Sequence, residues 1–229
     1  MNQNDKNSNE VKKIIPSKLE TGFQQFLYRH VGKHIPEQMT PNQMTLIGAL
    51  GGLFGIICTF LTNISSYFFV GSIIGLVIHL IADDLDGYIA RKRAMASKAG
   101  AFLDLITDIM FITYLIIAFG FSGYLSFPVA ILFVPVYAIM MVTAMHYILN
   151  LNEFLFPRLG PIETHLCFIL ICIGCMIWGK NPVLSGSYYK LKLADILLIL
   201  GGIPMYFEMI RLQVQLFQRL RKIEQTGDD

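Results

Sequence analysis

Long apolar stretches separated by short polar segments run through most of the 229-residue sequence. A helix needs about 20 mostly apolar residues to cross a bilayer. Because backbone groups in lipid must be hydrogen-bonded within their own segment, and the alternating pattern of a barrel strand is absent, such stretches are predicted to be helices. The chain is therefore expected to be an all-α integral membrane protein with six transmembrane helices. They are predicted at Thr45–Thr62, Ser66–Ala82, Phe102–Phe121, Phe127–Leu149, Thr164–Gly179 and Leu193–Phe217.

The segment before the first apolar stretch has a different pattern. It opens with a polar, Asn-rich run that predicts a disordered tail. Beyond it, Leu19, Phe23 and Leu27 recur at helical spacing among Lys and Arg, which predicts an amphipathic helix lying on the membrane surface. The expected organisation is a tail at 1–13, the surface helix at 14–38, the six-helix domain at 39–220 and a C-terminal tail at 221–229.

Composition and charge support this class and add an orientation. Hydrophobic residues make up 54% of the chain and charged residues 15%, whereas soluble domains are roughly a quarter charged. A soluble all-helical protein with a large core is the alternative that this composition disfavours. Fifteen Lys and Arg fall on the side of the predicted helices that holds both termini, and only Lys180, Lys190 and Lys192 fall on the other. The excess predicts cytoplasmic termini.

Four aspartates flank the connection between the second and third apolar stretches. Asp83 and Asp86 are three residues apart, and Asp104 and Asp108 are four apart, so each pair shares one helix face. A helical hairpin would bring the four carboxylates to one level near the cytoplasmic surface. Asp84 lies about 100° round the helix from Asp83, and is expected either to support the site or to face the cytoplasmic rim.

Clustered carboxylates need compensation inside a membrane. Each charge costs at least about 2.5–3.5 kcal/mol there on insertion scales, and the nearby basic residues are few. Protonation, cationic partners or bound metal must therefore compensate. Carboxylate oxygens suit hard divalent cations, which favours Mg²⁺ or Mn²⁺, with room for two ions.

Small and basic residues follow the first aspartate pair. Gly87 and Ala90 share the face of Asp83, where small side chains allow either the close approach of a ligand or close helix packing. Arg91 suits either a phosphate group or an ordinary positive-inside anchor. Spacing alone does not choose between the alternatives for Gly87 and Ala90, and for Arg91 it favours the anchor.

The stretch from Asp83 to Asp108 resembles the signature of the CDP-alcohol phosphotransferase (CDP-alcohol phosphatidyltransferase) family, D-x2-D-G-x2-A-R-x8-G-x3-D-x3-D. The segment TPNQMT at 40–45 is similar to the family's entry into its first membrane helix. The resemblance implies a membrane enzyme that transfers a substituted phosphate from a CDP-linked donor to an alcohol and releases CMP. One of the two substrates would be a lipid. The resemblance also implies a homodimer, and no nucleic acid is expected as a partner.

The same resemblance assigns roles to residues. Asp83, Asp86 and Asp104 would hold two Mg²⁺ or Mn²⁺ ions against the donor's diphosphate. Asp108, the fourth carboxylate of this metal site, would be the general base for the acceptor hydroxyl. The residues expected to line the cytidine diphosphate pocket are Asn42, Thr45, Gly87, Ala90, Arg91, Ser97 and Gly100.

The identity of the substrates is less constrained by the sequence. Between Phe102 and Leu200 the few Lys and Arg lie in or beside predicted loops, which argues against a phosphate-bearing acceptor. Gly-Pro-x-Glu at 160–163 resembles a segment of aminoalcohol phosphotransferases, and a carboxylate would suit choline or ethanolamine. Helix initiation by Pro161 and Glu163 explains the same residues. His165 is either a cavity group or a packed hydrogen-bonding side chain.

Three functions therefore remain to be compared. The sequence favours a CDP-choline or CDP-ethanolamine donor with a diacylglycerol acceptor. The alternative within the family is a CDP-diacylglycerol donor with glycerol phosphate, inositol phosphate or serine as acceptor. A divalent-cation transporter would also contain carboxylates within the membrane. It is disfavoured because the outer halves of the third to sixth apolar stretches offer almost no polar path.

Overall fold

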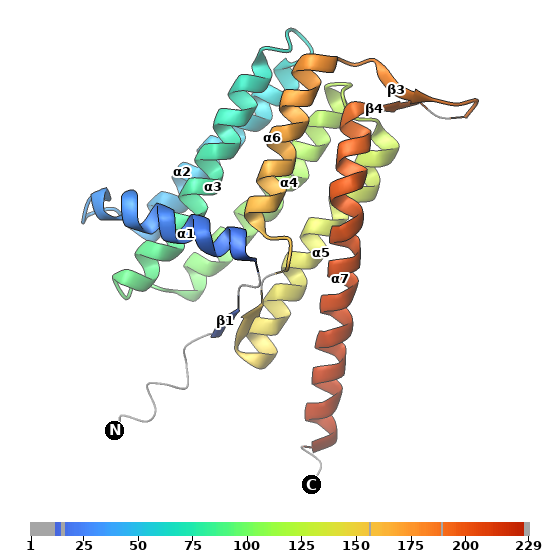
Figure 1. The fold of residues 1–229 in the computed structure, drawn as a ribbon. Coiled ribbons are helices and arrows are strands. Elements are labelled where there is room, and N and C mark those ends of the chain that lie inside the picture. The colour runs from blue at the N-terminus through green and yellow to red at the C-terminus, as the bar shows by residue number, and fades with distance from the viewer. Residues whose placement is uncertain (1–11, 15–16, 156, 189, 227–229) are drawn as a thin grey trace, which may run out of the picture.

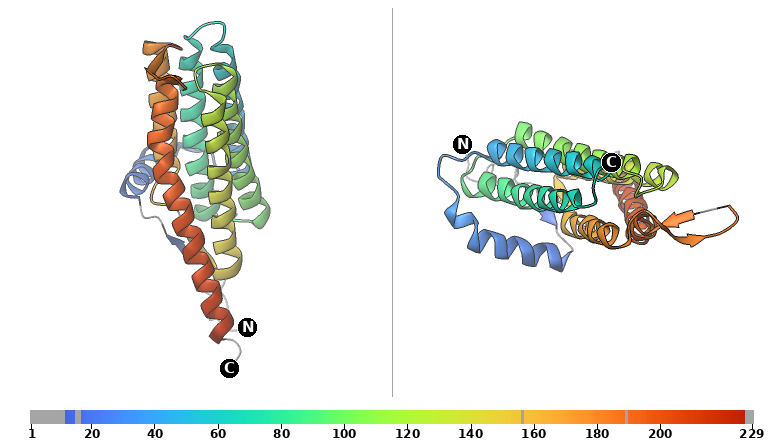
Figure 2. Two further views of the ribbon diagram at one scale, coloured as in Figure 1. Left: turned by 90° about the vertical axis from the view of Figure 1, so that its right-hand side faces the viewer. Right: turned by 90° about the horizontal axis from the view of Figure 1, so that it is seen from above.

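Six long helices form the body of the protein in the computed structural model, which describes residues 12–14, 17–155, 157–188 and 190–226 (Figure 1). Each of the six is long and apolar enough to cross a membrane. A shorter helix, α1 (Lys18–His30), precedes them and lies crosswise against the outside of the bundle (Figures 1 and 2). The predicted fold is thus confirmed. The six helices are α2 (Pro41–Leu61), α3 (Phe68–Lys92), α4 (Lys98–Phe121), α5 (Phe127–Leu151), α6 (Pro161–Trp178) and α7 (Leu193–Thr226).

Local sequence signals fix where the helices that carry the predicted site residues begin. At α2 the Thr40 hydroxyl accepts from the Gln43 amide at 3.3 Å, and the Gln43 side chain accepts from the Thr40 amide at 2.9 Å. This capping box is followed by a proline at the first helical position. At α4 the Ser97 hydroxyl caps the helix by accepting from the Gly100 amide at 3.0 Å.

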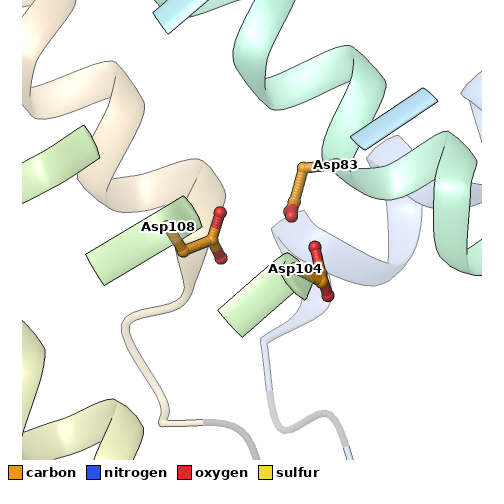
Figure 3. A group of neighbouring side chains, drawn as sticks. All are labelled: Asp83, Asp104 and Asp108. Atoms are coloured by element: carbon orange, nitrogen blue, oxygen red, sulfur yellow. The ribbon is translucent and has the colours of Figure 1, made fainter. Parts of the chain in front are cut away.

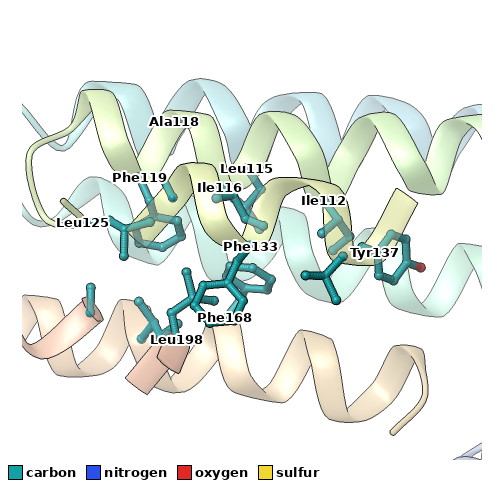
Figure 4. Packing of buried hydrophobic residues seen from close by; sticks show 14 of the residues in the cluster. Ile112, Leu115, Ile116, Ala118, Phe119, Leu125, Phe133, Tyr137, Phe168 and Leu198 are labelled. Atoms are coloured by element: carbon teal, nitrogen blue, oxygen red, sulfur yellow. The ribbon is translucent and has the colours of Figure 1, made fainter. Parts of the chain in front are cut away.

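The main hydrophobic core lies between helices α3 to α7 (Figure 4). Phe119 of α4 packs there with its ring centroid 6.1 Å from that of Phe168 in α6. The contact between α2 and α3 is closer still, because a Cβ built on Gly75 would lie only 2.5 Å from the Cα of Gly55. Small residues allow membrane helices to approach in this way. Leu50 and Ile131, which are 58% and 68% exposed, are among the large apolar side chains that cover the outside, as contact with lipid requires.

The element boundaries differ from the predicted ones at several places. The surface helix is shorter than 14–38, because strand β1 (Lys12–Ile14) precedes it and a 3-10 turn, η2 (Gly32–His34), follows it. The last helix continues to Thr226, past the predicted boundary at residue 220. Residues 1–11, which were predicted to be disordered, and 227–229 of the predicted tail lie outside the described residues.

Two short strand pairs were not predicted. β1 pairs in parallel with β2 (Glu153–Leu155), so the start of the chain meets the connection between α5 and α6. β3 (Pro182–Ser185) pairs in antiparallel with β4 (Lys190–Lys192) at the opposite end of the bundle. Pairings of three or four residues leave little periodic signal in a sequence.

Candidate functional site

Three of the four predicted metal ligands meet where α3 faces α4 (Figure 3). One carboxylate oxygen from each of Asp83, Asp104 and Asp108 lies within 4.8 Å of the other two. All three side chains are partly buried. Carboxylate oxygens are the ligands that Mg²⁺ and Mn²⁺ prefer, so the donor set and its convergence from two helices fit such an ion.

Asp86, the fourth predicted ligand, is bound from the neighbouring helix instead. Its side chain is 5% exposed, and its Oδ2 accepts a hydrogen bond from the Thr45 hydroxyl at 2.5 Å. Thr45 is itself one of the residues predicted to line the nucleotide pocket. Asp83, Asp104 and Asp108 thus converge on one point, and Asp86, whose side chain also meets that of Asp104, is the buried member of the cluster held by α2.

The first turns of α2 and α4 lie side by side. A Cβ built on Gly100 would lie 3.1 Å from Ser97 Oγ and 3.2 Å from Asn42 Oδ1. Three predicted pocket residues are therefore neighbours. The amide groups of a helix N-terminus and its positive dipole end favour an anion such as a diphosphate.

Arg91 folds back over Gly87. A Cβ built on Gly87 would lie 3.0 Å from Arg91 Nη1, and the three nearest atoms to that position all belong to the guanidinium. Arg91 Nη2 donates to the Tyr28 hydroxyl of α1 at 3.1 Å. Because Gly87 has no side chain, the Arg91 guanidinium has space to lie next to the residue that follows Asp86. Ala90, one turn on, accepts from the Met95 amide through its carbonyl, which closes the end of α3.

The connection between α3 and α4 is fastened to the segment before α2 by Arg93. Its guanidinium donates to the carbonyls of Pro36 at 2.9 Å, Glu37 at 2.9 Å and Met39 at 2.5 Å. Ala94 follows with a left-handed backbone, φ 53°. These bonds hold the beginnings of α2 and α4 at the same end of the bundle, where the aspartates lie.

Two buried histidines behind Asp108 escaped the sequence analysis as a pair. His165 Nδ1 lies 2.8 Å from the Pro161 carbonyl, which can only accept, so this nitrogen carries a proton. In a neutral His165, Nε2 then accepts from His79 Nδ1 at 3.3 Å. A neutral His79 consequently presents an unprotonated Nε2 to Asp108 Oδ1, 3.7 Å away. No spacing rule links residues 79 and 165, because the contact depends on how α3 packs on α6.

Asp84 and Glu163 have hydrogen-bond partners that bear on their alternative interpretations. Asp84 is buried, and its Oδ1 accepts from Gln24 Nε2 of α1 at 2.7 Å, so it does not face the cytoplasmic rim. Glu163 accepts from the Gly160 amide at 2.8 Å through Oε2 and from the Ser17 hydroxyl at 2.5 Å through Oε1. Both oxygens of Glu163 thus secure the start of α6, which supports the helix-initiation interpretation.

An apolar cavity of about 270 Å³ lies next to the aspartates, between α4, α5, α6 and α7. It begins at Ile112, one turn beyond Asp108, and continues between Phe133, Phe168 and Met205. Its lining is mostly apolar, which suits part of an aliphatic chain, with Glu163 and Thr164 of the first turn of α6 as its polar members.

Comparison with known proteins supports the family that the sequence motif indicated. The sequence pattern of the family described as CDP-alcohol phosphatidyltransferase matches residues 38–208, a range that includes every predicted site residue. The chain is also similar to the CDP-diacylglycerol–glycerol-3-phosphate 3-phosphatidyltransferase of Mycoplasma genitalium. The two are 26% identical over 182 residues, which cover 76% of this chain and 77% of the relative.

Proposed function

The chain belongs to the CDP-alcohol phosphatidyltransferase family, and we propose that it transfers a phosphatidyl group from CDP-diacylglycerol to a small polar alcohol with release of CMP. The observation that carries this proposal is the convergence of the Asp83, Asp104 and Asp108 oxygens within 4.8 Å of one another. Family membership makes the chain an enzyme, so the cation-transporter alternative is dropped.

The carboxylates fit Mg²⁺ or Mn²⁺ as the cofactor. Asp83, Asp104 and Asp108 would hold one ion, and Asp86, fixed by Thr45 at 2.5 Å, is the further carboxylate available to a second. Bound divalent cations neutralise charge on the diphosphate and on the leaving phosphate. The protein fixes the carboxylates on α3 and α4, which both pack on α2, so the charge-compensating geometry exists before substrates bind.

Asp108 is the proposed general base. It is one helical turn from Ile112, which lines the apolar cavity, and His79 Nε2 lies 3.7 Å from its Oδ1. Asp108 would take the proton of the acceptor hydroxyl as that oxygen attacks the phosphorus of the phosphatidyl group. The bond from this phosphorus to the CMP oxygen breaks, and CMP leaves with the electron pair.

The donor's cytidine diphosphate would lie among the predicted pocket residues. Asn42, Ser97 and Gly100 are neighbours at the paired helix starts, and Arg91 offers a guanidinium over Gly87. A planar guanidinium binds phosphate oxygens in a bidentate manner. The remaining two proposed lining residues are Thr45 and Ala90.

Two observations favour CDP-diacylglycerol over CDP-choline or CDP-ethanolamine as donor. The preference for an aminoalcohol rested on a carboxylate at Glu163, and both oxygens of Glu163 are engaged at the start of α6. The similar protein of Mycoplasma genitalium is named for CDP-diacylglycerol. In this assignment the apolar cavity receives part of a diacylglycerol chain of the donor.

The proposed orientation places the site and both termini on the cytoplasmic side. It is supported by the fifteen Lys and Arg on that side against three on the other. A homodimer is proposed from the family resemblance alone. Mass measurement of the protein in nanodiscs tests it, and a monomer would contradict it.

Release of CMP by the purified protein in lipid with Mg²⁺ or Mn²⁺ tests the function. One arm supplies CDP-diacylglycerol with glycerol 3-phosphate, inositol phosphate or serine. The other supplies CDP-choline or CDP-ethanolamine with diacylglycerol. We expect CMP in the first arm only. CMP in the second arm alone would reverse the donor assignment, and none in either arm from folded protein would contradict the proposal.

A further inference from the structure

The surface helix α1 contacts α3 along one face of each helix. Gln24 and Tyr28 are one turn apart on α1, and their partners on α3 are Asp84 and Arg91, seven residues apart and therefore also on one face. Between these two bonds the rings of Tyr28 and Tyr88 stack, with centroids 4.6 Å apart and an interplanar angle of 20°. The ring of Tyr28 is thus held by its stacking on Tyr88 and by the neighbouring bond between Gln24 and Asp84.

Arg91 depends on this contact for the position of its charged group. The side chain starts from the α1-facing side of α3, is exposed, and returns over Gly87, one residue after Asp86. An exposed arginine otherwise has many rotamers available. Tyr28 accepts from Nη2 at 3.1 Å, while Nη1 is the nitrogen closest to Gly87. The hydrogen bond therefore fixes Nη2 of the guanidinium, while Nη1 lies over Gly87 and remains available to a ligand of the site.

We infer that Tyr28 is a positioning residue for donor binding, whose hydroxyl holds the Arg91 guanidinium over Gly87, where it meets the diphosphate of the nucleotide. This inference rests on the proposed function, because only there does Arg91 belong to a donor pocket. Fixing the guanidinium before the donor arrives reduces the entropy that binding must overcome.

Tyr28 is chemically suited to this role. Burial, with a smaller contribution from the charge of Asp84, raises the pKa of Tyr28 to about 12. The phenol is therefore neutral at physiological pH, and its oxygen accepts the hydrogen bond from Arg91. A charged phenolate would instead compete with the diphosphate of the donor for the guanidinium. Gly32 leaves the space that Tyr88 needs, since a Cβ there would lie 2.6 Å from the Tyr88 ring.

Tyr28 lies outside the part of the chain that matches the family, whereas its partner Arg91 lies inside it. The family match begins at residue 38, whereas α1 ends at His30. The signature accounts for Arg91 and Gly87 but says nothing about what orients the arginine. Tyr28 thus adds to the signature residues a support that comes from the surface helix.

Tyr28→Phe tests the inference, with Tyr88→Phe as the matched control. Both variants lose one hydroxyl from the same ring stack. Among the described residues, the Tyr88 hydroxyl accepts a hydrogen bond from Lys92 at 2.9 Å and from no other side chain, and Lys92 is a variable position of the signature. The protein is studied full-length in nanodiscs. Calorimetric titration with CDP and Mn²⁺ gives the affinity, and CMP release gives KM and kcat for CDP-diacylglycerol.

We expect Tyr28→Phe to raise the Kd for CDP and the KM for the donor roughly fivefold, because binding must then immobilise the freed Arg91 side chain, with kcat within twofold of wild type. Tyr88→Phe should match wild type. In an Arg91→Ala background Tyr28→Phe should have no further effect, because the group that it positions is gone.

Several results would overturn the inference while leaving the proposed function intact. They are wild-type CDP affinity in Tyr28→Phe, equal losses in both tyrosine variants, or an undiminished effect without Arg91. If wild type binds CDP but releases no CMP, the proposed reaction fails, and the Kd comparison alone decides the role of Tyr28. If wild type binds no CDP, both fail.

Discussion

The hydrogen bond between Thr45 and Asp86 provides a direct test of how the metal site is supported. Both side chains are buried, and the hydroxyl donates to Asp86 Oδ2 at 2.5 Å. Thr45→Val keeps the shape of the side chain but removes the donor. The carboxylate then has one hydrogen bond fewer, and its orientation toward a second ion is no longer fixed.

The size of the effect follows from the chemistry of this contact. A hydrogen bond to a charged group contributes about 1.5–3 kcal/mol, and each 1.4 kcal/mol is roughly a tenfold change in an equilibrium constant. Loss of an outer partner of a metal ligand typically costs about 10–100-fold in metal affinity or activity. We therefore expect the Mg²⁺ concentration for half-maximal CMP release to rise roughly 10–100-fold in Thr45→Val.

The assay is CMP release from CDP-diacylglycerol at increasing Mg²⁺, with saturating donor. Thr45→Ser keeps the hydroxyl and should restore most of the metal dependence. Thr143→Val is the matched control. Among the described residues, the Thr143 hydroxyl donates a hydrogen bond only to the Ile139 carbonyl of its own helix, at 2.8 Å. A wild-type metal dependence in Thr45→Val, with a raised KM for the donor, would show that Thr45 contacts nucleotide and refute its role in supporting the metal site.

Three further substitutions probe other parts of the account. Asp108→Asn should retain much of its Mn²⁺ and CDP binding but lose turnover at least about 100-fold. The comparison variant Asp83→Asn should lose both ligand binding and turnover. Wild-type turnover in Asp108→Asn would exclude Asp108 as the base. Glu163→Gln should leave the choice between CDP-diacylglycerol and CDP-choline unchanged and cost roughly 1 kcal/mol of stability, measured by thermal unfolding in detergent; a switch of donor would show that Glu163 reads the substrate. Gly75→Ala places a methyl group 2.5 Å from Gly55 Cα, so α2 and α3 must separate, and we expect a loss of about 1–3 kcal/mol in the same measurement; unchanged stability would contradict this tight contact.

The parts of the structure that follow from local rules were predicted from the sequence. Apolar length alone identifies six membrane helices, because lipid leaves the backbone no other partner. The three- and four-residue spacings of the aspartates predict shared helix faces, and the hairpin then brings Asp83, Asp104 and Asp108 together. The caps Thr40 and Ser97 are local signals of the same kind, but they were not used, and the predicted starts at Thr45 and Phe102 come after the observed ones at Pro41 and Lys98.

The contacts that depend on packing between distant helices were not predictable in this way. The amphipathic pattern predicts that α1 lies on a surface, but not that Gln24 and Tyr28 reach residues 84 and 91. Likewise His79 reaches Asp108 and His165 only after α3, α4 and α6 pack together. The helical spacing places Asp86 on the same face as Asp83, but it does not predict the hydrogen bond that Asp86 accepts from Thr45 of α2.

The central claim is that the clustered carboxylates hold a divalent cation that phosphatidyl transfer requires. The most direct measurement is CMP release from CDP-diacylglycerol by wild type and by Asp104→Ala, each with Mg²⁺ and after its removal by EDTA. We predict CMP from wild type that disappears with EDTA and returns with added Mg²⁺, and none from Asp104→Ala at any Mg²⁺ concentration. CMP formation that survives EDTA, or that persists in Asp104→Ala, would contradict the claim.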